Sequence, residues 1–317
     1  MASPPLTSPQ AVDLAVRVGT LELGNPILSA SGTFGYGLEF AHLAPLEQFG
    51  GIVTKGLSLE PLLGNPPHRI CETASGMLNS IGLQNIGIRR FLDQVLPDLA
   101  DYPAKVVVNL FGTTPDEYVR LAELVEPQPG IAAIELNVSC PNVKRGGIQF
   151  GHDPELLGDL VRRIRAVTGK PLIVKLSPNV TTPAAIALAA RQAGADALSA
   201  INTLVGMAID TRTRRPRLHT VKGGLSGPAI KPIALRIVFD VARASGLPVI
   251  GIGGIETVDD VLEFLLAGAS AVQVGTALFR DPRTAARLVG DLRQRLFEDG
   301  IASARELIGG VLLEPGA

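Results

Sequence analysis

Short runs of apolar residues recur along this chain, and longer stretches with helical spacing of apolar positions separate them. Strands buried on both faces of a parallel sheet read as continuous apolar runs. Their alternation with amphipathic helices is typical of successive βα units. The predicted strands are Pro26–Ala30, Gly51–Thr54, Lys105–Leu110, Ala132–Asn137, Pro171–Leu176, Ala195–Ile201, Pro248–Ile252 and Ala271–Val274.

Helical spacing predicts a helix after nearly every strand. Several of these segments open on or beside a proline, which suits a first helical turn because its N–H groups have no partner there. The predicted helices are Ile88–Leu99, Pro115–Val125, Pro154–Val167, Pro183–Ala193, Pro228–Ala244, Val258–Ala267 and Arg283–Phe297, with a weaker pattern at Glu39–Gln48.

Eight βα units predict an α/β fold, a single (β/α)8 barrel, which usually takes roughly 250 residues plus insertions. The chain has 317 residues. We expect residues 1–13 to form a flexible lead and residues 14–317 a single domain. LAVRVGTLELGNP alternates around Gly19-Thr20 and predicts an N-terminal hairpin that closes the barrel's N-terminal end. The long connections Lys55–Ile86 and Thr203–Gly227, after strands two and six, are expected to cover the active site.

Composition narrows the class of partner and the compartment. The formal net charge is −1, which gives no electrostatic reason to expect nucleic acid. No apolar stretch of about 18 residues occurs, so we expect no membrane span. The N-terminal sequence lacks the features of a signal peptide. Only Cys71 and Cys140 are present, which favours a reducing compartment, the cytoplasm.

The carboxyl ends of the predicted strands carry polar, reactive or glycine residues. In a (β/α)8 barrel these ends converge on one mouth, where barrel active sites lie. Any single Asn or Gly there is also a common turn former, so the interpretation depends on the whole set. The set is Ser31-Gly32, Lys55-Gly56, Asn109, Asn137, Lys175, Asn202-Thr203, Gly253-Gly254 and Gly275-Thr276.

Two lysines at this mouth, Lys55 and Lys175, predict a bound anionic group or an electron-rich cofactor, because a buried ammonium needs an anionic partner. The glycine-rich segments at 223–230, 251–254 and 274–279 each precede a predicted helix. Backbone N–H groups at a helix N-terminus favour a phosphate. The sequence therefore predicts a phosphorylated cofactor.

Cys140 lies in NVSCPNVKRGG, a glycine-containing loop after strand four. A thiol, with a reference pKa of about 8.5, can serve as a base above a cationic mouth. Cys71 is interpreted as a small buried apolar residue. Asn79, Asn137, Asn142 and Asn202 each offer a donor and an acceptor, which suits a ring with alternating C=O and N–H groups, such as a pyrimidinedione.

Two further groups of residues are not assigned to the site. The four histidines lack the spacing of a metal site, so no metal is expected. The run of four arginines between Arg212 and Arg217 is interpreted as a solvated loop.

The motifs together resemble those of a known family. The runs SGTFGYG, GMLNSIGLQN, NVSCPNV, VKLSPNV, INTLVGM, GGLSGPAIKP and IGIGGIETVDDVLEFLLAGASAVQVGTALF are similar to class 1 dihydroorotate dehydrogenases, from about Val16 to Asp281. GLQN, SPNV and INTLVGM are most similar to the NAD-linked subgroup, class 1B.

The resemblance implies oxidation of (S)-dihydroorotate to orotate in pyrimidine (UMP) biosynthesis, with FMN as hydride acceptor. It implies that Cys140 removes a proton from C5 while hydride leaves C6, and that Lys175 and Lys55 stabilise the negative charge. The implied FMN contacts are Ser31, Lys55, Gly56, Asn109, Asn137, Lys175, Ile201, Gly227, Gly253, Gly254, Gly275 and Thr276. The implied substrate contacts are Lys55, Asn79, Ser80, Ile81, Gly82, Leu83, Asn137, Asn142, Asn202 and Thr203.

The resemblance also implies a partner subunit that carries FAD and a 2Fe–2S cluster and passes the electrons to NAD+. Two cysteines fall short of the four ligands that such a cluster requires. A homodimer core within a heterotetramer is the implied assembly.

Other functions remain open from the residues alone. A Schiff-base aldolase barrel with Lys175 as the reactive amine would explain the lysine and the phosphate site. Another FMN-dependent pyrimidine reductase would share almost every motif. A non-catalytic binding barrel is the third alternative.

Overall fold

The computed structural model describes residues 6–139 and 150–314. Eight parallel strands form a closed barrel. Each strand pairs with the barrel strands that come before and after it in the sequence, and the last, β16, pairs with the first, β3. These strands are β3 (Ile27–Ser29), β4 (Gly51–Val53), β7 (Lys105–Leu110), β8 (Ala133–Asn137), β9 (Leu172–Leu176), β10 (Ala197–Ala200), β15 (Val249–Ile252) and β16 (Ala269–Val274). The predicted (β/α)8 barrel and all eight of its strands are confirmed.

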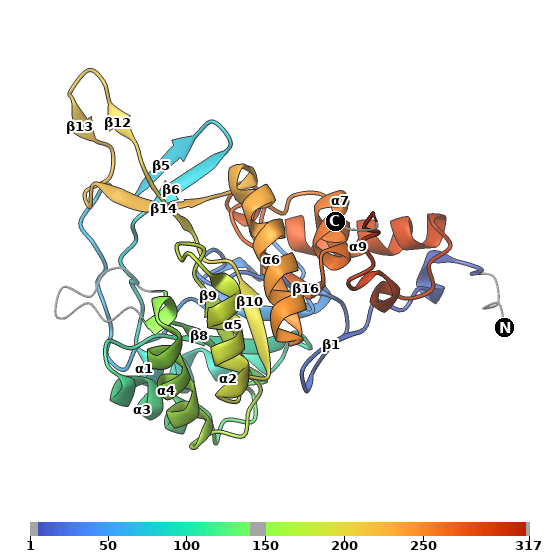
Figure 1. Ribbon diagram of the computed structural model, residues 1–317, viewed down its shortest axis with the longest axis horizontal. Helices are drawn as coiled ribbons and strands as arrows, with labels where there is room; N and C mark the ends of the chain where they lie inside the picture. Colours follow the sequence, from blue (N-terminus) through green and yellow to red (C-terminus); the bar gives the residue numbers. More distant parts are fainter. Residues whose placement is uncertain (1–5, 140–149, 315–317) are drawn as a thin grey trace.

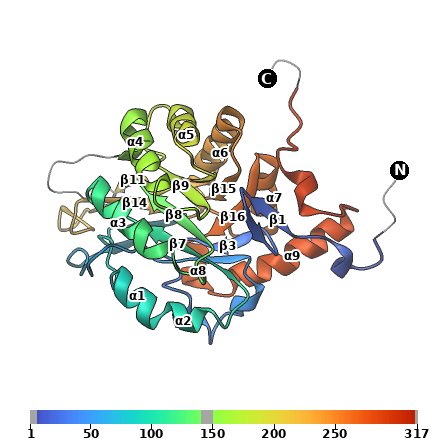
Figure 2. The same cartoon turned by 90° about the horizontal axis from the view of Figure 1, so that it is seen from below.

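Helices surround the barrel strands, as Figure 2 shows from below. They are α1 (Ile88–Gln94), α2 (Leu96–Leu99), α3 (Pro115–Val125), α4 (Pro154–Arg165), α5 (Pro183–Gln192), α6 (Lys231–Ser245), α7 (Val258–Leu266), α8 (Ala277–Arg280) and α9 (Thr284–Glu298). The helices α3, α4 and α5 begin at the predicted prolines. Thr114 and Asp153 accept backbone N–H bonds ahead of α3 and α4 and so fix where these two begin.

Three predicted helices differ from the structure, and in each case a proline lies where the observed element departs from the predicted helix. The segment Glu39–Gln48 is not an α-helix: it holds the 3₁₀ turns η2 (Leu38–Phe40) and η3 (Leu46–Gln48), separated at Pro45. The helix predicted over Ile88–Leu99 breaks at Val95, because Pro97 has no N–H to continue it. Pro228–Ile230 is the 3₁₀ turn η5, so α6 begins later than predicted.

The predicted N-terminal hairpin is present as β1 (Val16–Val18) and β2 (Leu21–Leu23). Gly19 has φ +62° at its turn, and a Cβ there would lie 3.1 Å from the backbone oxygen of Asp196, just before β10. Thr20 and Leu21 line one surface depression with the starts of three other barrel strands. The hairpin therefore lies against the N-terminal end of the barrel, as predicted.

The residues before the hairpin pack onto the C-terminal part of the chain. Pro9–Ala11 forms the 3₁₀ turn η1, Val12 is buried, and the Asp13 N–H donates to the Ala302 oxygen at 2.9 Å. Packing thus begins upstream of the predicted limit at residue 14. The remaining 3₁₀ turns are η4 (Phe150–His152) and η6 (Ala304–Leu307).

The two long insertions combine into one antiparallel sheet, which we call the insertion sheet. It consists of β5 (Ile70–Thr73), β6 (Gly76–Asn79), β11 (Leu204–Met207) and β14 (Lys222–Ser226), in the order β11-β14-β6-β5. Figure 1 shows it on one side of the barrel, with the small hairpin of β12 (Ile209–Asp210) and β13 (Arg215–Pro216) projecting beyond it. Both insertions follow carboxyl ends of barrel strands, as predicted.

The core is built from aliphatic side chains of the barrel strands and the inner faces of the helices. A few aromatic residues fill the larger gaps. Phe34 stacks on Phe40 with ring centroids 4.7 Å apart, and Tyr118 packs edge-on against Phe150. Among the residues that the structure describes, no helix is long and apolar enough to cross a membrane.

Candidate active site

The register of the barrel brings polar side chains together inside neighbouring strands. Asn109 of β7 pairs with Glu135 of β8, and Asn137 of β8 pairs with Lys175 of β9. Lys175 also pairs with Ser199 of β10. Residues two apart on a strand point to the same face, so Glu135 and Asn137 lie on one face of β8, with Asn137 nearer the mouth.

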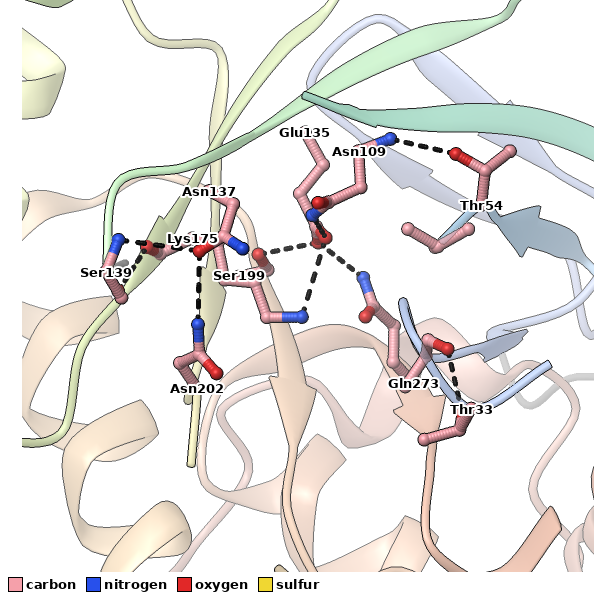
Figure 3. Close-up of polar contacts among 12 residues, drawn as sticks. Thr33, Thr54, Asn109, Glu135, Asn137, Ser139, Lys175, Ser199, Asn202 and Gln273 are labelled. Carbon is pink, nitrogen blue, oxygen red and sulfur yellow. Dashed lines mark hydrogen bonds and ion pairs between the residues drawn. The ribbon is translucent and has the colours of Figure 1, made fainter. Parts of the chain in front are cut away.

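Glu135 is a fully buried carboxylate at the centre of a polar network (Figure 3). Its Oε1 accepts a hydrogen bond of 2.7 Å from Asn109 Nδ2. Its Oε2 accepts bonds of 2.7 Å from Gln273 Nε2 and 2.8 Å from Ser199 Oγ. Lys175 Nζ lies 3.6 Å from Oε1 and balances the charge. Three hydrogen-bond donors and a neighbouring ammonium around one carboxyl group fit an ionised carboxylate, which only accepts.

Glu135, Ser199 and Gln273 are not among the site residues predicted from the sequence. A signal was present, because Glu135 interrupts an apolar strand two positions before Asn137, and Gln273 interrupts another. A charged residue within a buried strand must have partners in the interior. The structure also shows that the anion beside Lys175 is a side chain of the protein, whereas a bound group was predicted.

Two oxygens of this network have no hydrogen-bond donor among the described residues: Asn109 Oδ1 and Gln273 Oε1. Asn109 Oδ1 lies 3.0 Å from the point that a Cβ on Gly56 would occupy, so glycine leaves room beside it. A buried acceptor without a donor costs about 1–3 kcal/mol. A ligand that donates a hydrogen bond beside Gly56 would remove this cost.

Asn137 and Asn202 are in contact at the mouth. Asn202 Nδ2 donates to Asn137 Oδ1 at 3.2 Å, and Asn202 Oδ1 accepts from the Thr203 N–H at 2.8 Å. The buried Tyr118 hydroxyl donates to the backbone oxygen of Asn137 at 2.7 Å. The contact fixes the orientation of both amides, as recognition of a ring with fixed donors and acceptors requires.

Two distant parts of the chain meet at the start of the η5–α6 segment: Gly227, which follows β14, and Gly253-Gly254, which follow β15. Gly254 is so close to Gly227 that a Cβ on Gly254 would lie 2.9 Å from the Gly227 oxygen. Gly227, Gly253 and Gly254 have φ of +99°, +135° and +75°, a region that other residues rarely adopt. The close approach and the backbone shape both require glycine here.

The end of β16 joins the same place. Thr276 Oγ1 donates to Ser226 Oγ at 2.8 Å, and Ser226 directly precedes Gly227. We call residues 226–227, 253–254 and 276 the glycine cradle. It lies at the start of the η5–α6 segment, where backbone N–H groups favour an anion such as phosphate.

Lys55 follows β4 and is half-buried. Desolvation by burial lowers the pKa of its ammonium; the charge of Glu39 opposes this shift, and that of Arg69 adds to it. No carboxylate of the described residues lies within 4.0 Å of Lys55. An anionic ligand at this position would therefore supply the direct ion-pair partner that the described residues do not provide.

The run from Asn79 to Leu83 leaves the insertion sheet after β6. Asn79 Nδ2 donates to the Gly224 oxygen at 3.3 Å and so ties the run to β14. Gly82 and Leu83 have φ of +74° and +58°, which makes the run curve sharply. The hydroxyl of Ser80 is buried without a partner among the described residues.

The remaining predicted residues are placed as follows. Ser31 and Gly275 follow the adjacent strands β3 and β16. The Ile201 N–H donates to the Ile252 oxygen at 3.1 Å. Cys140 and Asn142 lie outside the described residues. Within the described parts of the chain, no group of His, Cys, Asp or Glu could hold a metal ion. The arginines between 212 and 217 are exposed, as the sequence indicated.

Fold and site together define a (β/α)8-barrel protein with a polar ligand site at its mouth and a glycine cradle beside it. The sequence profile of one family, dihydroorotate dehydrogenase, matches residues 13–296. The chain belongs to this family and is an oxidoreductase.

Two relatives carry the name dihydroorotate dehydrogenase B (NAD(+)), catalytic subunit. The protein from Geobacter sulfurreducens is 56% identical over 302 residues, which cover 95% of this chain and 99% of the relative. The protein from Geotalea uraniireducens is 56% identical over 300 residues, 95% of this chain and 98% of the relative. The resemblance to class 1B is thereby confirmed.

A solved structure of dihydroorotate dehydrogenase from Eimeria tenella, in complex with ferulenol, has a similar fold. The TM-score is 0.78 at 24% identity, with 97% of this chain and 91% of the other covered. The likeness confirms the barrel fold.

Proposed function

We propose that this chain is the catalytic subunit of a dihydroorotate dehydrogenase, which oxidises (S)-dihydroorotate to orotate in pyrimidine (UMP) biosynthesis with FMN as hydride acceptor. The observation that carries the proposal is the convergence of Lys55, Lys175 and the Asn137–Asn202 pair at one barrel mouth, beside the glycine cradle. The name of the relatives supports the same activity.

The residues present fit FMN. The glycine cradle suits its phosphate, because three backbone segments meet there at a helix start. Asn109 Oδ1, buried without a donor beside Gly56, suits a ring N–H. Ser31, Ile201 and the other residues implied by the family are the proposed remaining contacts. When bound, FMN supplies a two-electron acceptor for hydride.

The chain's own residues would orient the substrate and move its proton. The Asn137–Asn202 pair presents fixed amide groups to a pyrimidine ring. Lys55, which forms no ion pair within 4.0 Å among the described residues, would offer its ammonium to the substrate carboxylate. Cys140, with Asn142 in the same loop, is the proposed base that takes the proton from C5; the run Asn79–Leu83 and Thr203 are proposed to enclose the ring.

The proposed electron path continues outside this chain. The relatives are named as catalytic subunits of NAD(+)-linked enzymes, and we propose a partner subunit with FAD and a 2Fe–2S cluster that reduces NAD+ in the cytoplasm. A homodimer core within a heterotetramer is the proposed assembly. Sedimentation of the chain alone and with the partner tests this assembly, and a monomer in both cases would contradict it.

The aldolase alternative is disfavoured by the ion pair of Lys175 with Glu135, because a Schiff-base lysine reacts as the uncharged amine. Borohydride trapping of a carbonyl substrate on Lys175 would restore that alternative.

The test is a visible spectrum of the purified chain, followed by anaerobic addition of dihydroorotate. The flavin band is expected to bleach with dihydroorotate and to persist with dihydrouracil, which lacks the carboxylate. Bleaching with dihydrouracil alone would move the assignment to another pyrimidine reductase. If the purified chain binds no flavin even when FMN is supplied, the proposed function is wrong.

The two cysteines provide a matched pair of variants. Cys140→Ala is expected to bind FMN normally but to be reduced about 10²- to 10⁴-fold more slowly, the usual contribution of a catalytic base. Cys71→Ala changes a buried thiol in the insertion sheet and is expected to be reduced at the wild-type rate. Equal rates for the two variants would exclude Cys140 as the base.

A further inference from the structure

The carboxylate of Glu135 has no role in the proposed function, although two of its partners, Asn109 and Lys175, are proposed FMN contacts. Glu135 is 0% exposed, and burying a carboxylate is costly unless its surroundings compensate it. Its three hydrogen-bond donors come from β7, β10 and β16, and its ion-pair partner Lys175 comes from β9. Because burying this carboxylate is costly, a functional role for Glu135 is expected.

Glu135 decides which way two amides point. A primary amide can turn either its NH2 group or its oxygen toward a neighbour. An ionised carboxylate only accepts, so Asn109 and Gln273 must both turn their NH2 groups to Glu135, at 2.7 Å each. Their oxygens are thereby directed elsewhere, and both are buried without a donor among the described residues. The carboxylate thus makes Asn109 an acceptor beside Gly56.

Glu135 also forms an ion pair with Lys175 that leaves the hydrogen-bond donors of the ammonium unused. The distance of 3.6 Å between Lys175 Nζ and Glu135 Oε1 is longer than a hydrogen bond. The ammonium is therefore charge-balanced, while its N–H groups are not committed to Glu135. The pair is neutral in sum, so the barrel interior holds no net positive charge at this point.

We propose that Glu135 is a positioning residue of the flavin site, an inference that rests on the proposed function. It orients Asn109 so that Oδ1 accepts a hydrogen bond from a ring N–H of the isoalloxazine, and it keeps the Lys175 ammonium at the same place. Its negative charge also opposes negative charge on the ring, and so holds the reduction potential of bound FMN below the value that Lys175 alone would give.

Glu135→Gln tests both parts of the proposal. The glutamine has a single acceptor oxygen and an NH2 group, so Asn109 or Gln273 must turn its oxygen toward it. Since Asn109 can then face the flavin with a donor, FMN is expected to bind about 10- to 100-fold more weakly. Loss of the anion is expected to shift the reduction potential of the remaining bound FMN to more positive values. Fluorescence titration of the apoprotein and equilibrium reduction against a reference dye measure the two effects without turnover.

Two further variants separate positioning from a general structural effect. Ser199→Ala removes one hydrogen bond to Glu135 Oε2 and leaves the charge and both amides as they are. It is expected to bind FMN within a few-fold of wild type, at an unchanged potential. The exchange variant Glu135→Gln with Asn109→Asp restores a carboxylate to the network and an acceptor beside Gly56, so it is expected to recover most of the affinity.

The outcomes are distinct. If wild type binds FMN and Glu135→Gln binds it equally well at the same potential, the role of Glu135 is refuted and the proposed function stands. If wild type binds no FMN, the proposed function itself fails. Should Glu135→Gln not fold, the exchange variant carries the test, and a folded exchange variant that binds no FMN would overturn the inference.

Discussion

The glycine cradle is tested most directly at Gly227, which follows β14 and begins the segment leading into α6. Its φ is +99° and its ψ −170°, a region essentially restricted to glycine that costs other residues about 1–3 kcal/mol. A Cβ on Gly227 would lie 2.6 Å from Gly76 Cα, so the turn between β5 and β6 would have to move as well. Gly227→Ala therefore introduces at least this strain.

The strain is expected to lower either the thermal stability of the apoprotein or its affinity for FMN. If the turn keeps its shape, the apoprotein loses about 1–3 kcal/mol of stability, and Tm falls by roughly 1–2 °C per kcal/mol for a chain of 317 residues. If the turn relaxes, the apoprotein keeps its Tm and FMN must restore the strained shape. The Kd for FMN then rises by about 5- to 150-fold, since 1.4 kcal/mol corresponds to a factor of ten.

The assay combines thermal melting of the apoprotein with fluorescence titration by FMN. The matched control is Gly290→Ala in α9, where a new Cβ meets no atom within 4 Å. A helical Gly→Ala change is expected to stabilise the protein by about 0.5–1 kcal/mol and to leave FMN affinity unchanged. A Gly227→Ala variant with wild-type Tm and wild-type Kd would refute the argument that this backbone shape forms the cradle.

Three further expectations concern charge and hydrogen bonding. Because burial lowers the pKa of Lys55 below its ordinary 10.5, the unfolded chain binds more protons in the window below that value. Stability therefore rises with pH there, and melting scans of Lys55→Met should lack this contribution. Burial acts to raise the pKa of Asp260, but hydrogen bonds from Lys231 and the backbone outweigh it and lower the pKa. The ionised Asp260 carboxylate therefore stabilises the folded state above its unfolded pKa of about 3.9. This stabilisation is lost as pH falls through the lower pKa of the folded state. Asp260→Asn should thus cost about 1–2 kcal/mol near pH 7, and a difference from wild type that does not narrow in acid would contradict this. Tyr118→Phe removes the 2.7 Å bond to the Asn137 oxygen and should lower stability by about 1 kcal/mol, measured by melting; an unchanged Tm would show that the bond contributes nothing.

The barrel could be predicted because its signal is local. Each strand is a continuous apolar run, and the prolines and glycines beside it mark where helices begin and end. The prediction failed where spacing and backbone chemistry disagree. Glu39–Gln48 has helical spacing, but Pro45 offers no N–H and restricts the residue before it, so two short turns form.

The site could be predicted only as far as the strand ends. Asn137 and Asn202 follow from the rule that carboxyl ends of barrel strands converge, and the structure brings them into contact. Glu135 and Gln273 lie inside strands and depend on each other across the barrel, 138 positions apart in the chain. A local sequence pattern cannot indicate a hydrogen-bond partner that lies so far away in the sequence.

The long separation between Glu135 and Gln273 sets an order of events during synthesis. The carboxylate leaves the ribosome well before β16 exists, and until that strand closes the barrel Glu135 lacks one of its donors and must stay hydrated. Water is fully excluded from the barrel interior only once β16 has paired with β15 and β3. A chain that stops before β16 is therefore expected to bind no flavin in a titration, even though it contains most of the proposed contacts.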